Sequence, residues 1–485
     1  MDDQTTPDRF GGTAVQAEAG AETKQRLVDD AIKYVWRHGT PIQGTRQAQG
    51  PISVRGKGVR ITDIDGKTYL DGLAGGSAAA TMGYGREDIA AAVAEQMTKL
   101  HYTSIRTFLN IPAIELGKQI AETTGGKLQT SFFVSSGSEA VDTASQIAKA
   151  YHRMKGNTQK SKFLYRQMSF HGVSLVGASA ASSPEYRDWF HPLAPGFIEV
   201  PGCYTYRRPE GKTESEWGLE CAQAIEDEIL RQRPETIAAL FAEVMPAPIV
   251  LPPPPEYLRR IREICDQYDI LWIDDEIFIG FGRTGKYFGY EHYGVVPDVV
   301  TVSKGLTGGY IPLGAAIASP KVMEVLVGDG EAHQAKVQGH TYTGHAVACA
   351  GALSVLKALR DERLVDNVAR LGERLVAQFN QFAEEYPYVG DVRGKGFLIG
   401  IELVKDKNSK EPFPAEWSVG KKIVAAAQRN GFLCRSARDI VPQKGFEVGD
   451  IITFFPAFVA TQSDIDEMVE KTKTAIVEVC DSLPL

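Results

Sequence analysis

The sequence has few cysteines, and their arrangement does not suggest cross-linking. The six cysteines of this 485-residue chain are Cys203, Cys221, Cys265, Cys349, Cys434 and Cys480. None of them forms a Cys-x-x-Cys pair, which a zinc site or a redox motif normally contains. We therefore expect reduced, mostly buried thiols in a cytoplasmic protein rather than a disulfide framework.

Signals for several other protein classes are also missing. No run of about 18 apolar residues is present, so we expect no membrane-spanning helix. Residues 1–24 lack the basic start and apolar centre of a signal peptide and are predicted to be a flexible tail. The net charge is −8 and no basic stretch occurs, which argues against a nucleic-acid partner. His340 and His345 lie in a Gly/Thr loop without nearby carboxylates, so we expect no metal site.

Common nucleotide-binding and hydrolase motifs are absent or occur in the wrong context. The chain has neither G-x-x-x-x-G-K-[ST] nor G-x-S-x-G. Gly280–Gly285 matches G-x-G-x-x-G, but it does not directly follow a predicted strand and does not open a predicted helix. A dinucleotide-binding fold requires both features.

What the chain does contain is a regular alternation of short apolar runs and helical stretches from residue 86 to about 320. The apolar runs cover residues 131–134, 163–165, 236–241, 270–273 and 299–302. Short buried strands separated by helices predict a parallel α/β sheet covered on both faces. After residue 346, predicted helices and strands indicate a smaller α+β domain.

We divide the chain accordingly. The predicted parts are the tail 1–24, an N-terminal segment 25–85 that joins the small domain, a large cofactor-binding domain 86–345 and a small domain 346–485. The N-terminal segment contains a hairpin signal, Asp65-Gly66, between two alternating runs.

Three predicted strand ends carry chemically useful groups. Ser136-Gly137-Ser138 stands between a strand and a helix, where free backbone N–H groups bind anions. Asp275 ends the second strand, and Lys304 follows the third. Taken singly, these are compatible with a serine cap, a structural ion pair and a solvent-exposed lysine. Together they suit pyridoxal phosphate, which needs a phosphate cradle, an acid for its pyridine nitrogen and a lysine for its aldehyde.

Longer motifs strengthen this interpretation through a resemblance. The segments SSGSEAVDTA (135–144), SFHG (169–172), DDEIFIGFGRTG (274–285), PDVVTVSKGLTGGYIPLGA (297–315), GHTYTGHAVACAGAL (339–353) and RGKGFLIGIEL (393–403) resemble class III aminotransferases. This resemblance implies the α/β fold of fold type I: a mixed, mostly parallel sheet with helices on both faces, plus a smaller α+β domain. It also implies pyridoxal 5'-phosphate as cofactor and a homodimer, or a tetramer, with shared active sites.

The resemblance assigns roles to individual residues. Lys304 would form the Schiff base, Asp275 would hold the pyridine nitrogen, and Ser136, Gly137 and Ser138 would bind the phosphate. The remaining cofactor contacts implied are Phe170 and Ile277 on the two ring faces, His171, Glu243, and Thr341 reaching the neighbouring subunit's phosphate. The chain departs from the family pattern at Phe170, which is usually Tyr, and at Val244, which is usually Pro.

The substrate side of the site is also expected from the resemblance. Pro248 replaces the glutamate that pairs a gate arginine in the ornithine and 4-aminobutyrate branch. Arg435 matches the arginine with which ω-transaminases pair a keto-acid carboxylate, although Phe455-Pro456 and an insertion at about 440–449 depart from that branch. The loop 75–80 is small where ω-transaminases often carry a bulky aromatic residue. We expect Ser77 and Phe170 to line a roomy substrate pocket.

These observations predict an aminotransferase with a ping-pong mechanism. It would move an amino group from a primary amine or ω-amino acid, including bulky or long ones, to a 2-oxo acid, with pyruvate as the expected acceptor. Three alternatives stay open: a lyase, decarboxylase or epimerase on the same fold, a 2-oxoglutarate-dependent aminotransferase, and a non-catalytic binding protein.

Overall fold

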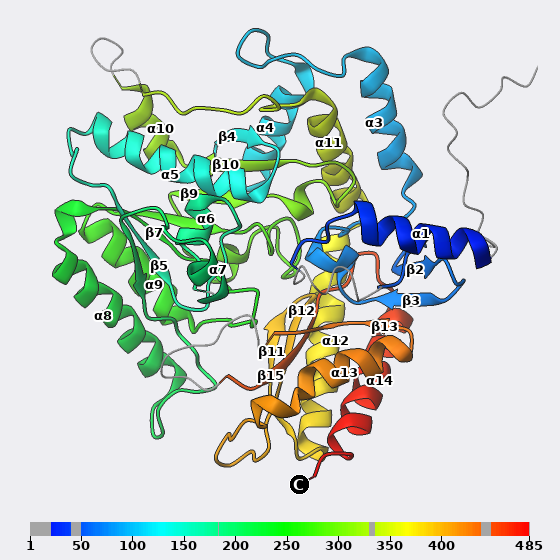
Figure 1. The fold of residues 1–485 in the computed structure, drawn as a ribbon. Coiled ribbons are helices and arrows are strands. Elements are labelled where there is room, and N and C mark those ends of the chain that lie inside the picture. The colour runs from blue at the N-terminus through cyan, green and yellow to red at the C-terminus, as the bar shows by residue number, and fades with distance from the viewer. Residues whose placement is uncertain (1–20, 40–49, 183, 329–334, 438–447, 485) are drawn as a thin grey trace, which may run out of the picture.

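The computed structural model describes residues 21–39, 50–182, 184–328, 335–437 and 448–484. They form three β-sheets surrounded by helices (Figure 1). The largest sheet has the strand order β4-β10-β9-β8-β7-β5-β6. Its strands are β4 (Thr130–Val134), β5 (Lys162–Arg166), β6 (Phe197–Val200), β7 (Ile237–Phe241), β8 (Leu271–Asp275), β9 (Val299–Val302) and β10 (Gly314–Ala318).

The strand directions make this a mixed, mostly parallel sheet. Strand β10 runs antiparallel to both of its neighbours, β4 and β9. The pairs from β9 through β8, β7 and β5 to β6 are parallel. Strands β6 and β10 were not predicted from the sequence. Strand β10, Gly-Ala-Ala-Ile-Ala, has one β-branched residue, so its propensity gives a weak strand signal.

Helices cover both faces of the large sheet. Alternate side chains such as Leu271 and Ile273 pack with Val141 and Ala144 of α5 (Gly137–Met154). The side chains between them, such as Trp272, pack with the helices α8 (Glu214–Gln232) and α9 (Pro255–Gln267). This two-sided burial confirms the predicted α/β fold class and follows from the period of two along a strand.

The other helices complete the layers around this sheet. Helices α3, α4 and α11 pack on one another at one end (Figure 1). Their bounds, with those of the shorter helices, are α3 (Glu87–Lys99), α4 (Ile111–Thr123), α6 (Leu175–Ser179), α7 (Pro184–Trp189), α10 (Pro320–Val327) and α11 (Ala346–Asp361).

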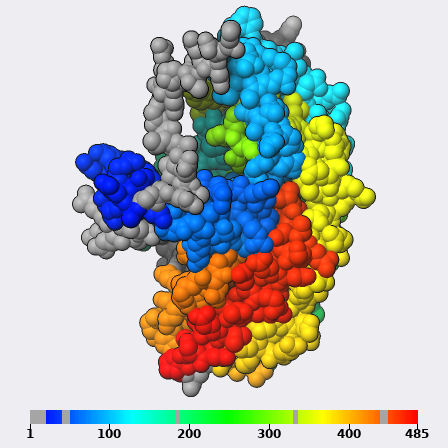
Figure 2. Space-filling view, turned by 90° about the vertical axis from the view of Figure 1, so that its right-hand side faces the viewer, coloured from blue at the N-terminus to red at the C-terminus, as the bar shows by residue number. Residues whose placement is uncertain are grey.

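Two smaller sheets bring the ends of the chain together. One joins the N-terminal strands β1 (Ser53–Lys57), β2 (Arg60–Asp63) and β3 (Thr68–Asp71) to β13 (Phe432–Leu433). The other contains β11 (Val389–Lys395), β12 (Leu398–Leu403), β15 (Asp450–Phe454) and β14 (Arg435–Ser436). Helices α12 (Leu364–Glu385), α13 (Val419–Arg429) and α14 (Gln462–Cys480) pack beside them. Figure 2 shows the N-terminal strands in blue against the orange and red C-terminal segments. The predicted domain boundaries remain a prediction.

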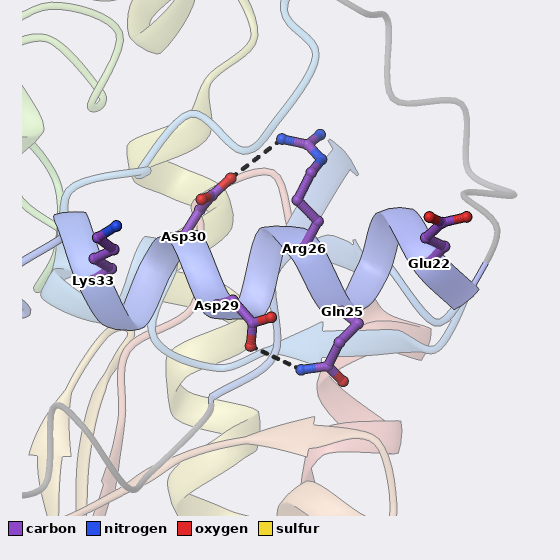
Figure 3. A pocket seen from close by; sticks show the side chains of 6 residues that line it. All are labelled: Glu22, Gln25, Arg26, Asp29, Asp30 and Lys33. Atoms are coloured by element: carbon purple, nitrogen blue, oxygen red, sulfur yellow. Dashed lines mark hydrogen bonds and ion pairs between the residues drawn. The ribbon is translucent and has the colours of Figure 1, made fainter.

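The N-terminal helix corrects one boundary. Helix α1 (Ala21–Tyr34) includes residues 21–24, which we had assigned to the tail; residues 1–20 lie outside the described part. No α1 residue is buried, and the helix protrudes in Figure 2. Polar side chains of α1 line a hollow on its surface (Figure 3). Among them, Gln25 donates a hydrogen bond to Asp29 at 2.9 Å, and Arg26 donates one to Asp30 at 3.2 Å. Because this hollow is lined by one helix alone, we assign it no function.

Other sequence expectations concern side chains and helices throughout the fold. All six cysteines are free and buried. Among the described residues, no group of three His, Cys, Asp or Glu side chains could hold a metal ion. Within the same part of the chain, no helix is both long enough and apolar enough to cross a bilayer. The loop 75–80 begins with an irregular backbone, since Gly75 and Gly76 have φ values of +82° and +83°.

Candidate active site

The candidate site lies at one edge of the large sheet. Strands β4, β7, β8 and β9 share a direction, so their carboxyl ends meet at the same edge. Ser136, Glu243, Asp275 and Lys304 occupy or closely follow those four ends. Parallel sheets bind ligands in the crevice outside their carboxyl edge. The topology therefore places the predicted residues from distant parts of the sequence along a single edge.

The start of α5 forms an anion cradle. The Ser136 side chain accepts a hydrogen bond from the Glu139 backbone N–H at 3.2 Å, and the Glu139 carboxylate accepts one from the Ser135 N–H at 2.6 Å. The first four N–H groups of a helix have no intrahelical partner. The N–H groups of Gly137 and Ser138 are thus oriented toward a ligand, where the helix dipole favours negative charge.

Two glycines allow neighbouring side chains to pack closely against this cradle. A Cβ on Gly137 would lie 2.9 Å from the side chain of Ile277. A Cβ on Gly172 would lie 2.5 Å from the Ser138 hydroxyl oxygen, and Gly172 has a φ of +106° that favours glycine. The Ser138 hydroxyl also accepts a hydrogen bond from the Val173 N–H at 3.2 Å. The cradle therefore has little tolerance for side chains at either glycine.

Asp275 is buried and held by two donors. His171 Nδ1 lies 2.8 Å from Asp275 Oδ2, and the Ile277 N–H donates to Oδ1 at 3.0 Å. His171 Nε2 lies 3.7 Å from Glu243 Oε2. Burial acts to lower the pKa of His171, but the charges of Glu243 and Asp275 outweigh it and raise that pKa. A protonated His171 would favour the ionised form of Asp275.

Glu243 connects this pair to Phe170. The Phe170 N–H donates to Glu243 Oε1 at 3.1 Å, and buried Arg166 donates to the Glu243 backbone carbonyl. The Phe170 side chain remains 38% exposed, so its ring can contact a ligand. In this arrangement Glu243 positions the aromatic residue and adds negative charge beside His171.

Lys304 combines partial solvent access with a desolvated amino group. Surrounding protein lowers the pKa of Lys304 to about 8. The charge of Asp275 opposes this shift, whereas the positive charges of Arg435 and Arg283 add to it. Lys304 Nζ lies 4.4 Å from the centre of the Phe278 ring, and its φ of +25° is unusual for a residue with a side chain. An amine with a lowered pKa is more often neutral and nucleophilic.

Arg435 lies on β14 of a small sheet, close enough for its charge to act on Lys304. Its guanidinium carbon lies 5.1 Å from the centre of the Phe455 ring, and its Nε donates to the Thr453 hydroxyl at 3.4 Å. Its Nη2 is buried without a hydrogen-bond partner among the described residues. Burial lowers the pKa of Arg435 to about 10. Residues 440–447 of the predicted insertion lie outside the described part.

Ser77 and Thr341 occupy more peripheral positions. Ser77 is exposed in its loop, and this loop packs close to the segment after Lys304, because a Cβ on Gly309 would lie 3.2 Å from Ala79. Thr341 is exposed, and its carbonyl accepts a hydrogen bond from the Tyr102 hydroxyl at 3.0 Å. Among the described residues, no hydrogen bond links Thr341 to the α5 cradle.

Several residues near the site were missed from the sequence. They are Arg166, Phe278, Arg283 and Phe455. Phe455 was noted only as a departure from the family pattern, without a role in the site. The only hint in the sequence that Phe278 lies near the site is its position three residues after Asp275. Arg166 and Arg283 look like ordinary polar residues of a strand end and a loop, since their partners lie far away in the sequence.

The residues present fit pyridoxal phosphate. The cradle at Gly137 and Ser138 supplies N–H donors of the kind that bind phosphate. The buried Asp275 carboxylate suits a protonated pyridine nitrogen, and the desolvated Lys304 amine suits an aldehyde. The absence of a Cβ at Gly137 and Gly172 lets Ile277 and the Ser138 hydroxyl pack directly against this cradle.

Comparisons with known proteins agree with this chemistry. The family model "Aminotransferase class-III" matches residues 44–476. A taurine–pyruvate aminotransferase from Bilophila wadsworthia is 37% identical over 94% of this chain and 98% of its own length. A thermostable (S)-enantioselective ω-transaminase from Thermomicrobium roseum is 38% identical, with a TM-score of 0.86 and coverage of 94% of this chain and 98% of that one. An aminotransferase from Vibrio fluvialis, solved in its PMP-bound form, is 32% identical, with a TM-score of 0.86 and coverage of 93% and 98%. The chain therefore belongs to the class III aminotransferases, which are pyridoxal-phosphate enzymes.

Proposed function

We propose that this aminotransferase moves an amino group from a primary amine or ω-amino acid to a 2-oxo acid, with pyruvate as the acceptor, by a ping-pong mechanism. The observation that carries the proposal is the buried Arg435 guanidinium, whose Nη2 has no hydrogen-bond partner among the described residues. A guanidinium in this state suits a carboxylate ligand. Support also comes from the taurine–pyruvate aminotransferase and the ω-transaminase described above.

The residues of this chain would divide the work among them. When bound, pyridoxal phosphate withdraws electrons from the substrate Cα–H bond. Lys304 would take up and return the proton at Nζ, which its lowered pKa of about 8 favours. Asp275, assisted by His171, would hold a positive charge on the ring nitrogen. The α5 cradle would bind the phosphate, and Phe170 and Ile277 would hold the ring between them.

A panel of donors and acceptors tests this function. Each donor is incubated with the holoenzyme and either pyruvate or 2-oxoglutarate, and both the alanine or glutamate and the carbonyl product are quantified. We expect pyruvate to be converted to alanine when the donor is a primary amine without a carboxylate group. Turnover with 2-oxoglutarate alone would favour the alternative acceptor, and product formation without any keto acid would favour a lyase or decarboxylase.

Replacing Arg435 by alanine is expected to raise KM for pyruvate roughly 100-fold, because the acceptor carboxylate loses its charged partner. The amine half-reaction with 1-phenylethylamine, which has no carboxylate, should change by less than about threefold. Arg429→Ala is a matched control, since Arg429 is 63% exposed in an ion pair with Glu478. Equal losses in both half-reactions would contradict the assigned role.

Replacing Ser77 by tryptophan is expected to lower kcat/KM for bulky amines about tenfold or more while sparing short ones, because the ring would fill a loop of small residues. Steady-state kinetics with 2-aminobutane and 1-phenylbutylamine measures the difference. Ser463→Trp, at an exposed position near the start of α14, controls for the added surface ring. The roomy pocket is wrong if only short amines react in the unmodified enzyme and Ser77→Trp changes nothing.

We further propose that the enzyme is a homodimer, or a tetramer built from such dimers, with Thr341 serving the neighbouring subunit's phosphate. Support comes from the exposure of Thr341 and from nearby exposed apolar side chains in the chain segment before α4 and at its start, such as Phe108, Leu109 and Ile111. Sedimentation equilibrium tests the mass directly. We also propose a cytoplasmic setting, which the six free thiols suit. We keep the domain boundaries of the sequence analysis, except that the N-terminal segment begins with α1 at Ala21.

A further inference from the structure

We propose that Phe278 is a positioning residue, whose ring face holds the protonated amino group of Lys304 beside Asp275. This rests on the proposed role of Lys304 as the residue that carries a proton during turnover. Such a lysine must keep its amino group near the reacting atoms whenever it is charged. The face of an aromatic ring attracts an ammonium group through its quadrupole.

The contact itself has the required geometry. Lys304 Nζ lies 4.4 Å from the centre of the Phe278 ring, well within the ~6 Å range of cation–π attraction. Phe278 follows β8 three residues after Asp275, so one short segment presents both the carboxylate and the ring to the lysine. The ring is partly buried and packs against the main hydrophobic core, which limits its movement.

A second ring keeps Phe278 in place. Phe278 and Phe455 meet edge to face, with centroids 4.9 Å apart and planes at 82°. Phe455 is fixed in turn, because its backbone N–H donates to the Gly72 carbonyl at 2.6 Å. The neighbouring Pro456 carbonyl accepts a hydrogen bond from buried Arg283. Two segments distant from Phe278 in the sequence, at Gly72 and at Phe455-Pro456, therefore help to fix the ring that contacts Lys304.

The charged groups around Lys304 act in opposite directions on its ammonium form, which the Phe278 ring would stabilise. Asp275 on β8 favours the ammonium form, whereas Arg435 on β14 and Arg283 after β8 disfavour it. Desolvation disfavours it as well. A leucine at position 278 would keep the apolar volume but lose the quadrupole, so it would shift the balance further toward the neutral amine.

The test measures the amino group directly rather than through turnover. The cofactor is removed from the full-length chain, and Lys304 is labelled with cyanate, which reacts with neutral amines, over a series of pH values. Peptide mass spectrometry gives the midpoint of labelling. For Phe278→Leu we expect the midpoint to fall by about 0.5 to 1 pH unit. Phe278→Tyr keeps the ring and should retain the original midpoint.

Controls separate this effect from a general loss of structure. Phe382→Leu removes a ring from α12 that stacks on Tyr386, and it should leave the midpoint unchanged. If Phe278→Leu does not fold, Phe278→Met replaces it. An unchanged midpoint in a folded Leu or Met variant, or equal shifts in the Leu and Tyr variants, would overturn the proposal. If the midpoint shifts but the unmodified holoenzyme transaminates no donor, the positioning role stands and the proposed function fails.

Discussion

Replacing Lys304 by alanine is expected to abolish transamination, with a loss of at least about 10²–10⁴-fold from proton transfer alone. Lys304 closely follows β9 and is the lysine amine on which the charge of Asp275 acts. Borohydride reduction of the unmodified holoenzyme should fix the cofactor to the peptide containing Lys304, and the alanine variant should retain none. Mass spectrometry of the digested protein measures this fixation independently of activity.

A matched lysine elsewhere makes the result specific. Lys286 is exposed and donates to the Glu291 carbonyl, so Lys286→Ala should keep both activity and cofactor fixation. The Lys304→Ala variant should unfold at nearly the same temperature as the unmodified chain in the cofactor-free form, because no hydrogen bond from its side chain supports the fold among the described residues. Retained turnover in Lys304→Ala would refute the catalytic assignment.

Replacing Asp275 by asparagine is expected to lower kcat by roughly 10²-fold or more, because a neutral amide cannot stabilise charge on the ring nitrogen. The buried carboxylate accepts from His171 at 2.8 Å and from the Ile277 N–H at 3.0 Å. An amide of the same shape keeps the second bond while removing the negative charge. Single-turnover kinetics of each half-reaction, with cofactor saturating, measures the loss.

Asp274, the residue before Asp275 on β8, offers a closely matched control for Asp275→Asn. Asp274 is buried on the opposite face of β8, and its Oδ1 accepts from the Val244 N–H at 3.0 Å. Burial and the nearby carboxyl of Glu276 raise the pKa of Asp274 well above its usual range. Asp274→Asn keeps the size of the side chain and an oxygen that can accept from the Val244 N–H, so it should alter kcat by less than about threefold. Equal effects of the two substitutions would show that Asp275 acts through the fold alone.

The sequence predicted the strands that end at the site, because each is a short apolar run bounded by polar or small residues. It missed β10, whose glycine and alanines give little strand signal. It also missed the start of α1 at Ala21, since that exposed helix has no buried face to produce a strong apolar pattern. The motifs at Ser136, Asp275 and Lys304 were local enough to recognise without coordinates.

Contacts between distant segments were beyond the sequence. The role of His171 could not be derived until the structure placed it 2.8 Å from Asp275. The same holds for the Phe278 and Phe455 rings, which lie 4.9 Å apart despite their separation in the chain. The first contact depends on the strand order of the large sheet, and the second on the packing of the segment after β15 against the segment after β8. No pattern within a single segment carries that information.

By itself, the sequence placed an amine, a carboxylate and a predicted phosphate cradle each at the end of its own strand. Only the tertiary structure decided the burial and the electrostatic surroundings of those groups. Burial and the charges of Asp275, Arg435 and Arg283 together determine the pKa of the amine. The physical reason is that the identity of a side chain is local, whereas its solvation and electrostatic field come from every segment that folds around it.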